Sequence, residues 1–420
     1  MDVRVLILLA LEIVGLGLFL LWHSGLLKSR AAWLLSALLL IVAFALRIPP
    51  LSYETLDYQN FLSRWAAFYR ENGGFLAMDR SVGNYNIPYL YFLALYSYIN
   101  MKDLYLIKLL SILFDMLLAW SAMLLTSRFQ KSPARLLGCF FAVLYLPTVF
   151  LNSAVWSQCD SIYVALAVLG IYLALADRPT SSMVCIALSF GFKLQAVFVM
   201  PIYAVLWMMG KFKWKHFLIF PLSYVILVLP AVLLGRPFLD TITLYFNQTG
   251  SIGSGLNYNS ASIFAIFTHV QDKKLAAGIA VAAAFVCMIN LLAVAWANRA
   301  RLNERCVLAL SLLFAISIPF LLPHMHDRYF YAADILSLVL AFSFPAYSLT
   351  ALLVEFASFL GYHAYLKMRY LLLMHHGAAA LIVAMALALL CFLLGLEPVE
   401  PERTPKGSRA KKSRPAGNHS

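Results

Sequence analysis

Two histidines, two aspartates and an arginine lie close together in LLPHMHDRYFYAAD, residues 321–334, between two long apolar runs. Ionisable side chains are costly at membrane depth, and those that a hydrophobic chain retains are usually functional. The HxH spacing with a neighbouring Asp could hold a metal, but no second ligand cluster accompanies it. The donors suit phosphate and sugar better, with Arg328 giving bidentate contacts and His326 a titratable donor. Asp327 and Arg328 could also form only a structural ion pair.

Further polar side chains begin or interrupt other apolar runs. Asp57, in YETLDYQNFLSRWAAFYREN, either caps that helix or takes part in chemistry. NSAVWSQCDSIYVAL carries Gln158 and Asp160, where helix capping by Asp160 competes with contacts to a hydroxylated ligand. Trp156 in the same stretch could be an interfacial anchor. Lys193, in SFGFKLQAVFVMP, either snorkels to the surface or holds an anion at the tip of a broken helix.

The rest of the chain is strongly apolar, with 63% hydrophobic and 12% charged residues among 420 and a mean hydropathy of +0.82. It is therefore predicted to be an all-α polytopic membrane protein of about 11–13 spanning helices. The six cysteines lack CxxC spacing and indicate neither a zinc site nor a disulfide framework. The net charge of +13 falls largely in short connections, as the positive-inside rule expects, so no nucleic-acid partner is predicted.

The basic connections also predict an orientation. If residues 181–209 cross the membrane twice, these connections share one side, which is the cytoplasm. Three polar stretches then lie on the outer face: residues 48–103, 235–274 and 321–334. The first of them is expected to hold an amphipathic interfacial helix over residues 53–72 and a second, interfacial or half-inserted helix over residues 84–99. One membrane domain of residues 1–396 is predicted, followed by a basic, disordered cytoplasmic tail of residues 397–420.

The order of these blocks resembles that of bacterial relatives of the GPI mannosyltransferase II family, which are GT-C-type integral membrane glycosyltransferases. The resemblance covers about residues 45–345, and its most specific parts are the HMHDRYFY block and then WSQCDS. It implies transfer of mannose or another hexose from a polyprenyl-phosphate carrier to an acceptor hydroxyl on the outer face. The implied partners are this lipid-linked donor, a lipid-linked or envelope glycan as acceptor, and membrane lipids, in a bacterial plasma membrane.

The resemblance also implies roles for particular residues. Asp57 matches the family's catalytic acidic residue in the first outer loop and is expected to be the general base. The donor phosphate is expected at Arg328, Lys193 and His326. Sugar or acceptor contacts are expected from Gln158, Asp160, Asp327, Tyr331 and His324. No cofactor is expected, and the lack of a DxD pair argues against a tightly held metal.

Two features of the chain depart from the family pattern, and two functions other than sugar transfer are considered. Two helices precede the first outer loop where family members have one, which leaves the role of residues 1–30 open, and no large C-terminal domain follows that would fit a protein sequon acceptor. The alternative is a transporter or lipid flippase, suggested by the many spans and the intramembrane Lys193. Internal repeats are not evident, and the polar groups gather on one face, which favours an enzyme. A non-catalytic scaffold leaves the outer polar clusters unexplained.

Overall fold

The computed structural model describes residues 2–245 and 254–398. Within these ranges the chain is almost entirely helical, with one short parallel pairing between β1 (Asn257–Tyr258) and β2 (Met325–His326). Together with the long apolar helices described next, this confirms the prediction of an all-α polytopic membrane protein. The predicted cytoplasmic tail lies outside the described residues from residue 399 onward.

Eight helical segments in the described part of the chain are long and apolar enough to cross a membrane. They are α1 (Val3–Ala10), η1 (Leu11–Gly15) and α2 (Leu16–His23) as one; α3 (Arg30–Arg47) with η2 (Pro49–Ser52); α6 (Asp103–Thr126); α12 (Trp214–Phe217) with α13 (Ile219–Leu233); α16 (Lys273–Ala297); α17 (Glu304–Leu321); η10 (Pro345–Tyr347) with α19 (Ser348–Lys367); and α20 (Met374–Leu393). A ninth is α7 (Pro133–Leu144) with α8 (Pro147–Phe150) and η5 (Leu151–Val155), if this pair, bent by 45°, counts as one span.

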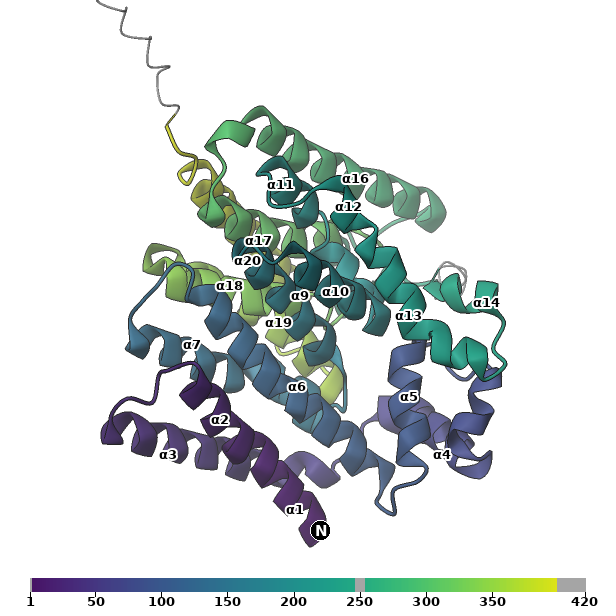
Figure 1. Cartoon of the computed structure of the whole chain (residues 1–420). Coiled ribbons are helices and arrows are strands. Elements are labelled where there is room, and N and C mark those ends of the chain that lie inside the picture. The colour runs from purple at the N-terminus through teal and green to yellow at the C-terminus, as the bar shows by residue number, and fades with distance from the viewer. Residues whose placement is uncertain (1, 246–253, 399–420) are drawn as a thin grey trace, which may run out of the picture.

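Shorter elements complete the fold (Figure 1). Four apolar helices of 10–17 residues are α5 (Ile87–Tyr96), α9 (Asp160–Leu175), α10 (Pro179–Phe192) and α18 (Tyr331–Ser343). The other short helices are η3 (Tyr58–Leu62), α4 (Ser63–Glu71), η4 (Gly74–Asp79), η6 (Leu194–Phe198), α11 (Ile202–Met208), α14 (Phe238–Ile242), η8 (Ile263–Ala265) and η9 (Arg299–Arg301). The predicted count of about 11–13 spans is reached if α9, α10 and α18 cross as well, because eight or nine plus three gives eleven or twelve.

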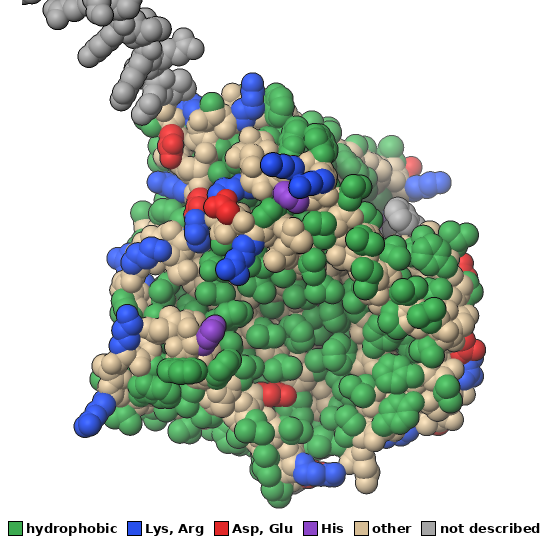
Figure 2. All heavy atoms as spheres, viewed as in Figure 1, with side chains coloured by type: hydrophobic (Ala, Val, Ile, Leu, Met, Phe, Trp, Pro, Cys, Tyr) green, Lys and Arg blue, Asp and Glu red, His purple; other side chains and the backbone are tan. Residues whose placement is uncertain are grey.

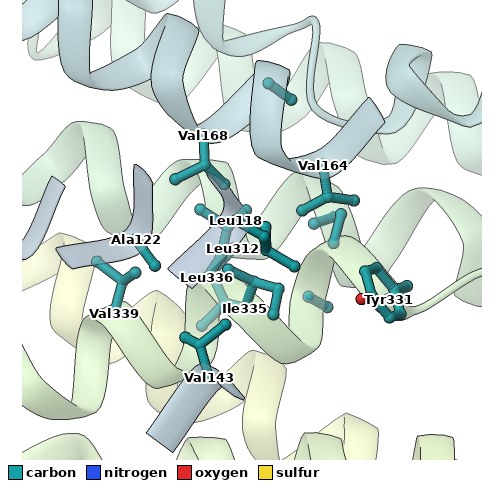
Figure 3. Close-up of a cluster of buried hydrophobic side chains, with 14 of the residues drawn as sticks. Leu118, Ala122, Val143, Val164, Val168, Leu312, Tyr331, Ile335, Leu336 and Val339 are labelled. Atoms are coloured by element: carbon teal, nitrogen blue, oxygen red, sulfur yellow. The ribbon is translucent and has the colours of Figure 1, made fainter. Parts of the chain in front are cut away.

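The helices divide into a buried centre and a lipid-exposed periphery. In the apolar stretch of each helix, 78% of the residues are buried in α17 and 72% in α6, but only 11% are buried in α16. α6 packs on α9, α9 on α10, and α18 on α19. Figure 3 shows this centre, where Leu118 of α6, Val164 of α9 and Leu336 of α18 point toward one another. The centre is therefore a packed apolar core, and the exposed helices present their apolar side chains to lipid.

Basic residues gather at one end of the central helices. Arg128, just after α6, pairs with Glu304 at the start of α17 at 2.5 Å, and Lys211 pairs with Asp177, just after α9, at 2.7 Å. The chain therefore runs from the end of α9 through α10 to the opposite end and returns through η6 and α11, as predicted for residues 181–209. The returning half is two short helices instead of one. Figure 2 shows a broad apolar band with Lys and Arg side chains mostly toward its upper and left margins.

Residues 48–103 contain the two predicted helices, but they differ in burial. η3 and α4 form an amphipathic helix that buries Leu62 and Tyr69 and leaves Phe61 50% exposed. α5 instead buries Tyr89 and Leu93 and packs against α10 and α13. Figure 1 shows α4 and α5 side by side at the edge of the molecule. α5 is thus packed against neighbouring helices of the protein.

Candidate functional site

Asp57 lies just before η3, and its side chain turns away from that helix. Its Oδ2 accepts hydrogen bonds from Trp156 Nε1 at 2.9 Å and from Gln158 Nε2 at 3.0 Å. Its backbone N–H donates to the Tyr365 hydroxyl at 3.1 Å. Because the carboxylate makes no capping hydrogen bond, the capping alternative is wrong. The side chain is 24% exposed, so a substrate has access to it.

The turn after η5 aims two side chains at this one carboxylate. Ser157, between Trp156 and Gln158, has φ of 66°, a left-handed conformation that costs a non-glycine residue about 1 kcal/mol. Trp156 is fully buried and stacks on Tyr365 with ring centroids 4.0 Å apart, so it is not an interfacial anchor. Gln158 Oε1 accepts a hydrogen bond from the Tyr85 hydroxyl at 2.9 Å, which fixes the amide that donates to Asp57.

Asp160 and Lys193 form a buried ion pair next to this turn. Asp160 is the first residue of α9, and its side chain caps nothing, so here too the capping alternative is wrong. Its Oδ1 pairs with Lys193, and its Oδ2 accepts a hydrogen bond from Asn152 Nδ2 at 2.8 Å. Lys193 ends α10 in an extended conformation and is 8% exposed, so it does not snorkel. Its charge is thus already matched by a carboxylate before any phosphate arrives.

Arg328 lies within ion-pair distance of three carboxylates but donates a hydrogen bond to none of them. Its Nη1 is 3.9 Å from Asp57 Oδ2 and 3.7 Å from Asp327 Oδ1, and its Nε is 3.4 Å from Asp160 Oδ2. The buried Nε has no hydrogen-bond partner among the described residues. The guanidinium carbon lies 5.2 Å from the Trp156 ring centroid, a cation–π contact. The charge is held in place while donor capacity remains for a planar or tetrahedral anion.

The two residues before Arg328 have strongly shifted pKa values. Burial raises the pKa of Asp327 to about 7, with Arg328 opposing this shift and the charge of Asp57 adding to it. Burial and, after it, the charge of Arg328 lower the pKa of His326 to about 4. The His326 ring stacks on Tyr258 with centroids 4.7 Å apart. Near neutral pH, His326 is therefore a neutral imidazole, and any phosphate contact it makes is a neutral hydrogen bond.

His324 and the small sheet brace this loop. His324 has φ of 62°, its Nδ1 lies 2.6 Å from the Gly255 carbonyl oxygen, and its backbone N–H donates to Leu256 O at 2.7 Å. α19 approaches the loop so closely that a Cβ on Gly361 would lie 2.7 Å from the Asp327 carbonyl oxygen. His324 thus ties its own loop to the segment around Gly255 and Leu256, and these contacts do not include Asp57.

The structure brings most of the predicted residues into one cluster, called here the site group. Its members are Asp57, Trp156, Gln158, Asp160, Lys193, Asp327 and Arg328. His326 lies beside it, with its backbone in β2.

Tyr331 belongs to different surroundings. It is fully buried and, in Figure 3, lies at one side of the apolar core of α9, α17 and α18. Its hydroxyl is 3.5 Å from Ser161 Oγ, which donates to Asp115 at 2.8 Å. Arg47, Asp115, Ser153 and Ser161 form a second cluster, called here the inner polar group.

Sequence reasoning missed several residues that hold the site group. Tyr365 and Tyr362 of α19 lie in an apolar helix, where aromatic residues at helical spacing indicate ordinary core, so no signal marked them. Asn152 donates to both Asp160 and the Tyr362 hydroxyl, each at 2.8 Å. Its position, a polar amide inside an apolar run eight residues before Asp160, was a usable signal.

This arrangement is suited to proton transfer beside a developing negative charge. The Asp57 carboxylate is oriented by two N–H donors and partly exposed, and the Arg328 guanidinium lies 3.9 Å away. A general base must be oriented and accessible, as the Asp57 carboxylate is, and a departing anion is stabilised by a nearby cation such as the Arg328 guanidinium. In residues 2–245 and 254–398, no three His, Cys, Asp or Glu side chains are grouped as a metal would need.

Comparison with known proteins agrees with a sugar transferase. The profile of the alpha-(1->6)-mannopyranosyltransferase N-terminal domain family matches residues 97–209. This segment runs from α6 to α11 and contains Gln158, Asp160 and Lys193, but neither Asp57 nor Arg328. No curated protein matches the chain significantly. The match covers about a quarter of the chain, and it supports a glycosyltransferase that handles mannose.

Proposed function

We propose that this protein is a mannosyltransferase that uses a polyprenyl-phosphate sugar as donor and a hydroxyl of a lipid-linked or envelope glycan as acceptor. The observation that carries the proposal is the separation of 3.9 Å between Asp57 Oδ2 and Arg328 Nη1 in a partly exposed group. The two residues are 271 positions apart in the sequence, since 328 minus 57 is 271. Asp57 matches the family's acidic residue in the first outer loop, and Arg328 lies in the HMHDRYFY block. The mannosyltransferase profile match supports the sugar class.

The proposed reaction assigns one task to each side of the site group. Asp57 accepts the proton of the acceptor hydroxyl, whose oxygen attacks the anomeric carbon of the sugar as the bond to the phosphate oxygen breaks. The leaving polyprenyl phosphate gains a negative charge, which the Arg328 guanidinium neutralises. Trp156 and Gln158 hold the Asp57 carboxylate in place by their hydrogen bonds. Lys193 stays paired with Asp160 and keeps that buried carboxylate balanced.

The outer face of a bacterial plasma membrane is the proposed location of the reaction. The basic pairs Arg128–Glu304 and Lys211–Asp177 lie at one end of the central helices, whereas the site group lies where α9 begins and α10 and α17 end. Basic connections favour the cytoplasm, so this distribution supports an outward-facing site and a cytoplasmic tail.

The proposal is tested by transfer in proteoliposomes. Purified protein is incubated with polyprenyl-phosphate mannose and a membrane glycan fraction, and products are analysed by mass spectrometry. A gain of one hexose on the acceptor, with release of polyprenyl phosphate, is expected. Movement of the intact donor across the bilayer without any covalent product would instead support a flippase and contradict the proposal.

A further inference from the structure

Two carboxyl groups that the proposed reaction does not use lie inside the helical bundle. Asp334 is in the first turn of α18 and is 1% exposed, and Glu355 is near the middle of α19 and is half-buried. α18 packs on α19, and the charge of Glu355 acts on Asp334. These two residues are called here the acid pair. Carboxylates at membrane depth are costly unless a cation or a proton balances their charge, so the acid pair requires a positively charged partner.

No side chain in the described part of the chain supplies this positive charge. Its ion pairs include neither Asp334 nor Glu355. The other titratable groups that interact with Asp334 are the phenols of Tyr163 on α9, Tyr331 on α18 and Tyr362 on α19. A phenol is neutral or negative, so it cannot balance a carboxylate. The balancing charge therefore has to come from a bound ion or proton.

Two hydroxyl groups reach the acid pair from two helices. Ser358 Oγ, on α19, donates to Asp334 Oδ1 at 2.6 Å, and Thr148 Oγ1, on α8, donates to Glu355 Oε2 at 2.8 Å. Ser358 and Glu355 are three residues apart on α19 and so share one face of that helix. Each hydroxyl oxygen keeps a lone pair after it has donated its hydrogen. Hydroxyl and carboxylate oxygens from three helices are thus gathered in one place.

One oxygen of this cluster has no partner. Asp334 Oδ2 is buried and accepts no hydrogen bond from any of the described residues. Because Ser358 holds Oδ1 on the face of α19 that carries Glu355, this carboxylate is turned toward the acid pair. Leaving a buried charged acceptor unsatisfied costs more than leaving a neutral one, and a buried group of this kind calls for an explanation. A bound cation would provide it.

Thr148 lies at a break in a membrane helix. α7 and α8 are bent by 45° relative to each other, and Leu146 between them is extended, with ψ of 128°. Broken helices hold Na⁺ or H⁺ in membrane proteins, because the break turns polar groups toward a buried site. Here Thr148 donates both its hydroxyl and its backbone N–H to Glu355, the latter at 3.1 Å. The break therefore directs polar groups at the acid pair.

We propose that the acid pair binds one Na⁺ ion, with oxygens of Asp334, Glu355, Thr148 and Ser358 as its ligands. Hard cations prefer oxygen ligands, and these four side chains offer only oxygens. Ca²⁺ takes about six to eight oxygens, and Mg²⁺ usually keeps several waters, so a small set of buried side chains suits a monovalent ion better. A proton takes the place of the ion when it leaves, because the same oxygens bind either one.

The test measures ion binding without catalysis. Full-length protein in phosphatidylcholine nanodiscs is equilibrated with radioactive Na⁺, and its melting is compared in NaCl, KCl and choline chloride of equal ionic strength. The wild type is expected to bind Na⁺ at about one ion per chain. It should melt about 2–4 °C higher in NaCl than in choline chloride when Na⁺ is about tenfold above its dissociation constant. Because protons compete, Na⁺ binding should weaken as pH falls.

Two variants and a matched control locate the ion. Asp334→Asn should stay folded, because it removes a buried charge, but it should lose both the bound Na⁺ and the rise in melting temperature. Ser358→Ala should weaken Na⁺ binding roughly tenfold, because it removes one polar ligand of a charged group. The control is Ser311→Ala, since Ser311 is also buried but donates to the Val307 carbonyl oxygen at 2.8 Å. It should bind Na⁺ like the wild type.

Several results would overturn this assignment. They are equal stabilisation by KCl or choline chloride, stronger stabilisation by Ca²⁺ than by Na⁺, or an undiminished Na⁺ response in Asp334→Asn. Stability that depends on pH but not on Na⁺ would show that the acid pair binds protons alone, and would overturn it as well. None of these measurements depends on sugar transfer, so the Na⁺ site and the proposed function can fail separately.

Discussion

The molecule contains two arginine–carboxylate clusters, and they differ in whether the arginine donates hydrogen bonds to protein acceptors. In the inner polar group, Arg47 and Asp115 are 1% and 0% exposed, and Arg47 donates to Asp115 and to the Leu144 carbonyl oxygen at 3.3 and 3.0 Å. In the site group, Arg328 and Asp57 are 14% and 24% exposed and 3.9 Å apart. Arg47 thus donates hydrogen bonds within the protein, whereas Arg328 lies at ion-pair distance from its carboxylates, 3.4 Å at the shortest, to Asp160, without a hydrogen bond to them.

This difference separates a structural ion pair from a candidate reaction site. The carboxylate of Asp115 also accepts hydrogen bonds from the hydroxyls of Ser153 and Ser161, at 2.5 and 2.8 Å. Breaking one partner of a buried pair of this kind leaves an uncompensated charge in the core, which is strongly destabilising. The Nε of both arginines has no hydrogen-bond partner among the described residues, but Arg328 Nη1 lies 3.9 Å from Asp57 and 3.7 Å from Asp327, beyond hydrogen-bond distance, so this nitrogen is available to a ligand. The inner polar group should therefore govern stability, and the site group should govern transfer.

The largest expected difference between the two clusters is in the effects of replacing each arginine by alanine. Arg328→Ala should lower the transfer rate by about 10²–10³-fold, because it removes the charge that stabilises the leaving phosphate. Arg47→Ala should instead lower the free energy of unfolding by about 3–5 kcal/mol, because it leaves Asp115 buried and unpaired. Both are measured as transfer per folded protein and as melting in detergent. Equal loss of stability in both variants would contradict the distinction.

Removing one hydrogen bond to Asp57 should have a smaller effect within the site group. Trp156→Phe keeps an aromatic ring next to Tyr365 but removes the N–H that donates to Asp57 at 2.9 Å. Because hydrogen bonds to charged groups contribute about 1.5–3 kcal/mol, transfer should fall by at least about tenfold. The matched control is Trp120→Phe, which loses a hydrogen bond to Ser24 Oγ at 3.1 Å. A loss of transfer in the control as large as in Trp156→Phe would show that the effect is not specific.

The smallest expected effect is on the pH dependence of stability. The pKa of Asp327 is raised from 3.8 to about 7, so the stability that its protonation gives is lost as pH rises toward 7. The pKa of His326 is lowered from 6.5 to about 4, so its contribution to stability increases as pH rises from about 4 to 6.5. Asp327→Asn removes only the first contribution. Its melting temperature relative to the wild type should increase from pH 5 to pH 7 and then level off at about 2 °C above it.

A relative melting temperature of Asp327→Asn that falls as pH rises would contradict the assigned pKa direction. Asp79→Asn is a suitable control, since Asp79 is 49% exposed and should alter the melting temperature little at any of these pH values.

The fold class and much of the site were predictable from sequence because both depend on local patterns. Long apolar runs predict spans, and polar residues at the ends of those runs drew attention to Asp57, Asp160, Lys193 and Arg328. Two of these residues, Asp57 and Asp160, looked like helix caps, and only the contacts of their side chains show that they cap nothing.

The remaining features depend on contacts between distant segments. Nothing in the sequence of α19 indicates that Tyr365 meets Trp156, 209 positions earlier, since 365 minus 156 is 209. Tyr331 lies in the same block as Arg328, three residues later, yet it faces Ser161 in the core. Burial likewise determines that His326 is neutral near pH 7, which its type and position could not reveal.

The most direct test of the central claim compares two carboxylates of the segment before η3, Asp57 and Glu54. Asp57→Asn removes the proposed base while its neighbours can stay in place. Glu54→Gln removes a carboxylate three residues earlier that pairs with Lys102 at 2.5 Å. In single-turnover transfer from polyprenyl-phosphate mannose, Asp57→Asn should lose about 10²–10⁴-fold in rate with its melting temperature preserved, and Glu54→Gln should match the wild type. Wild-type transfer by folded Asp57→Asn would contradict the account.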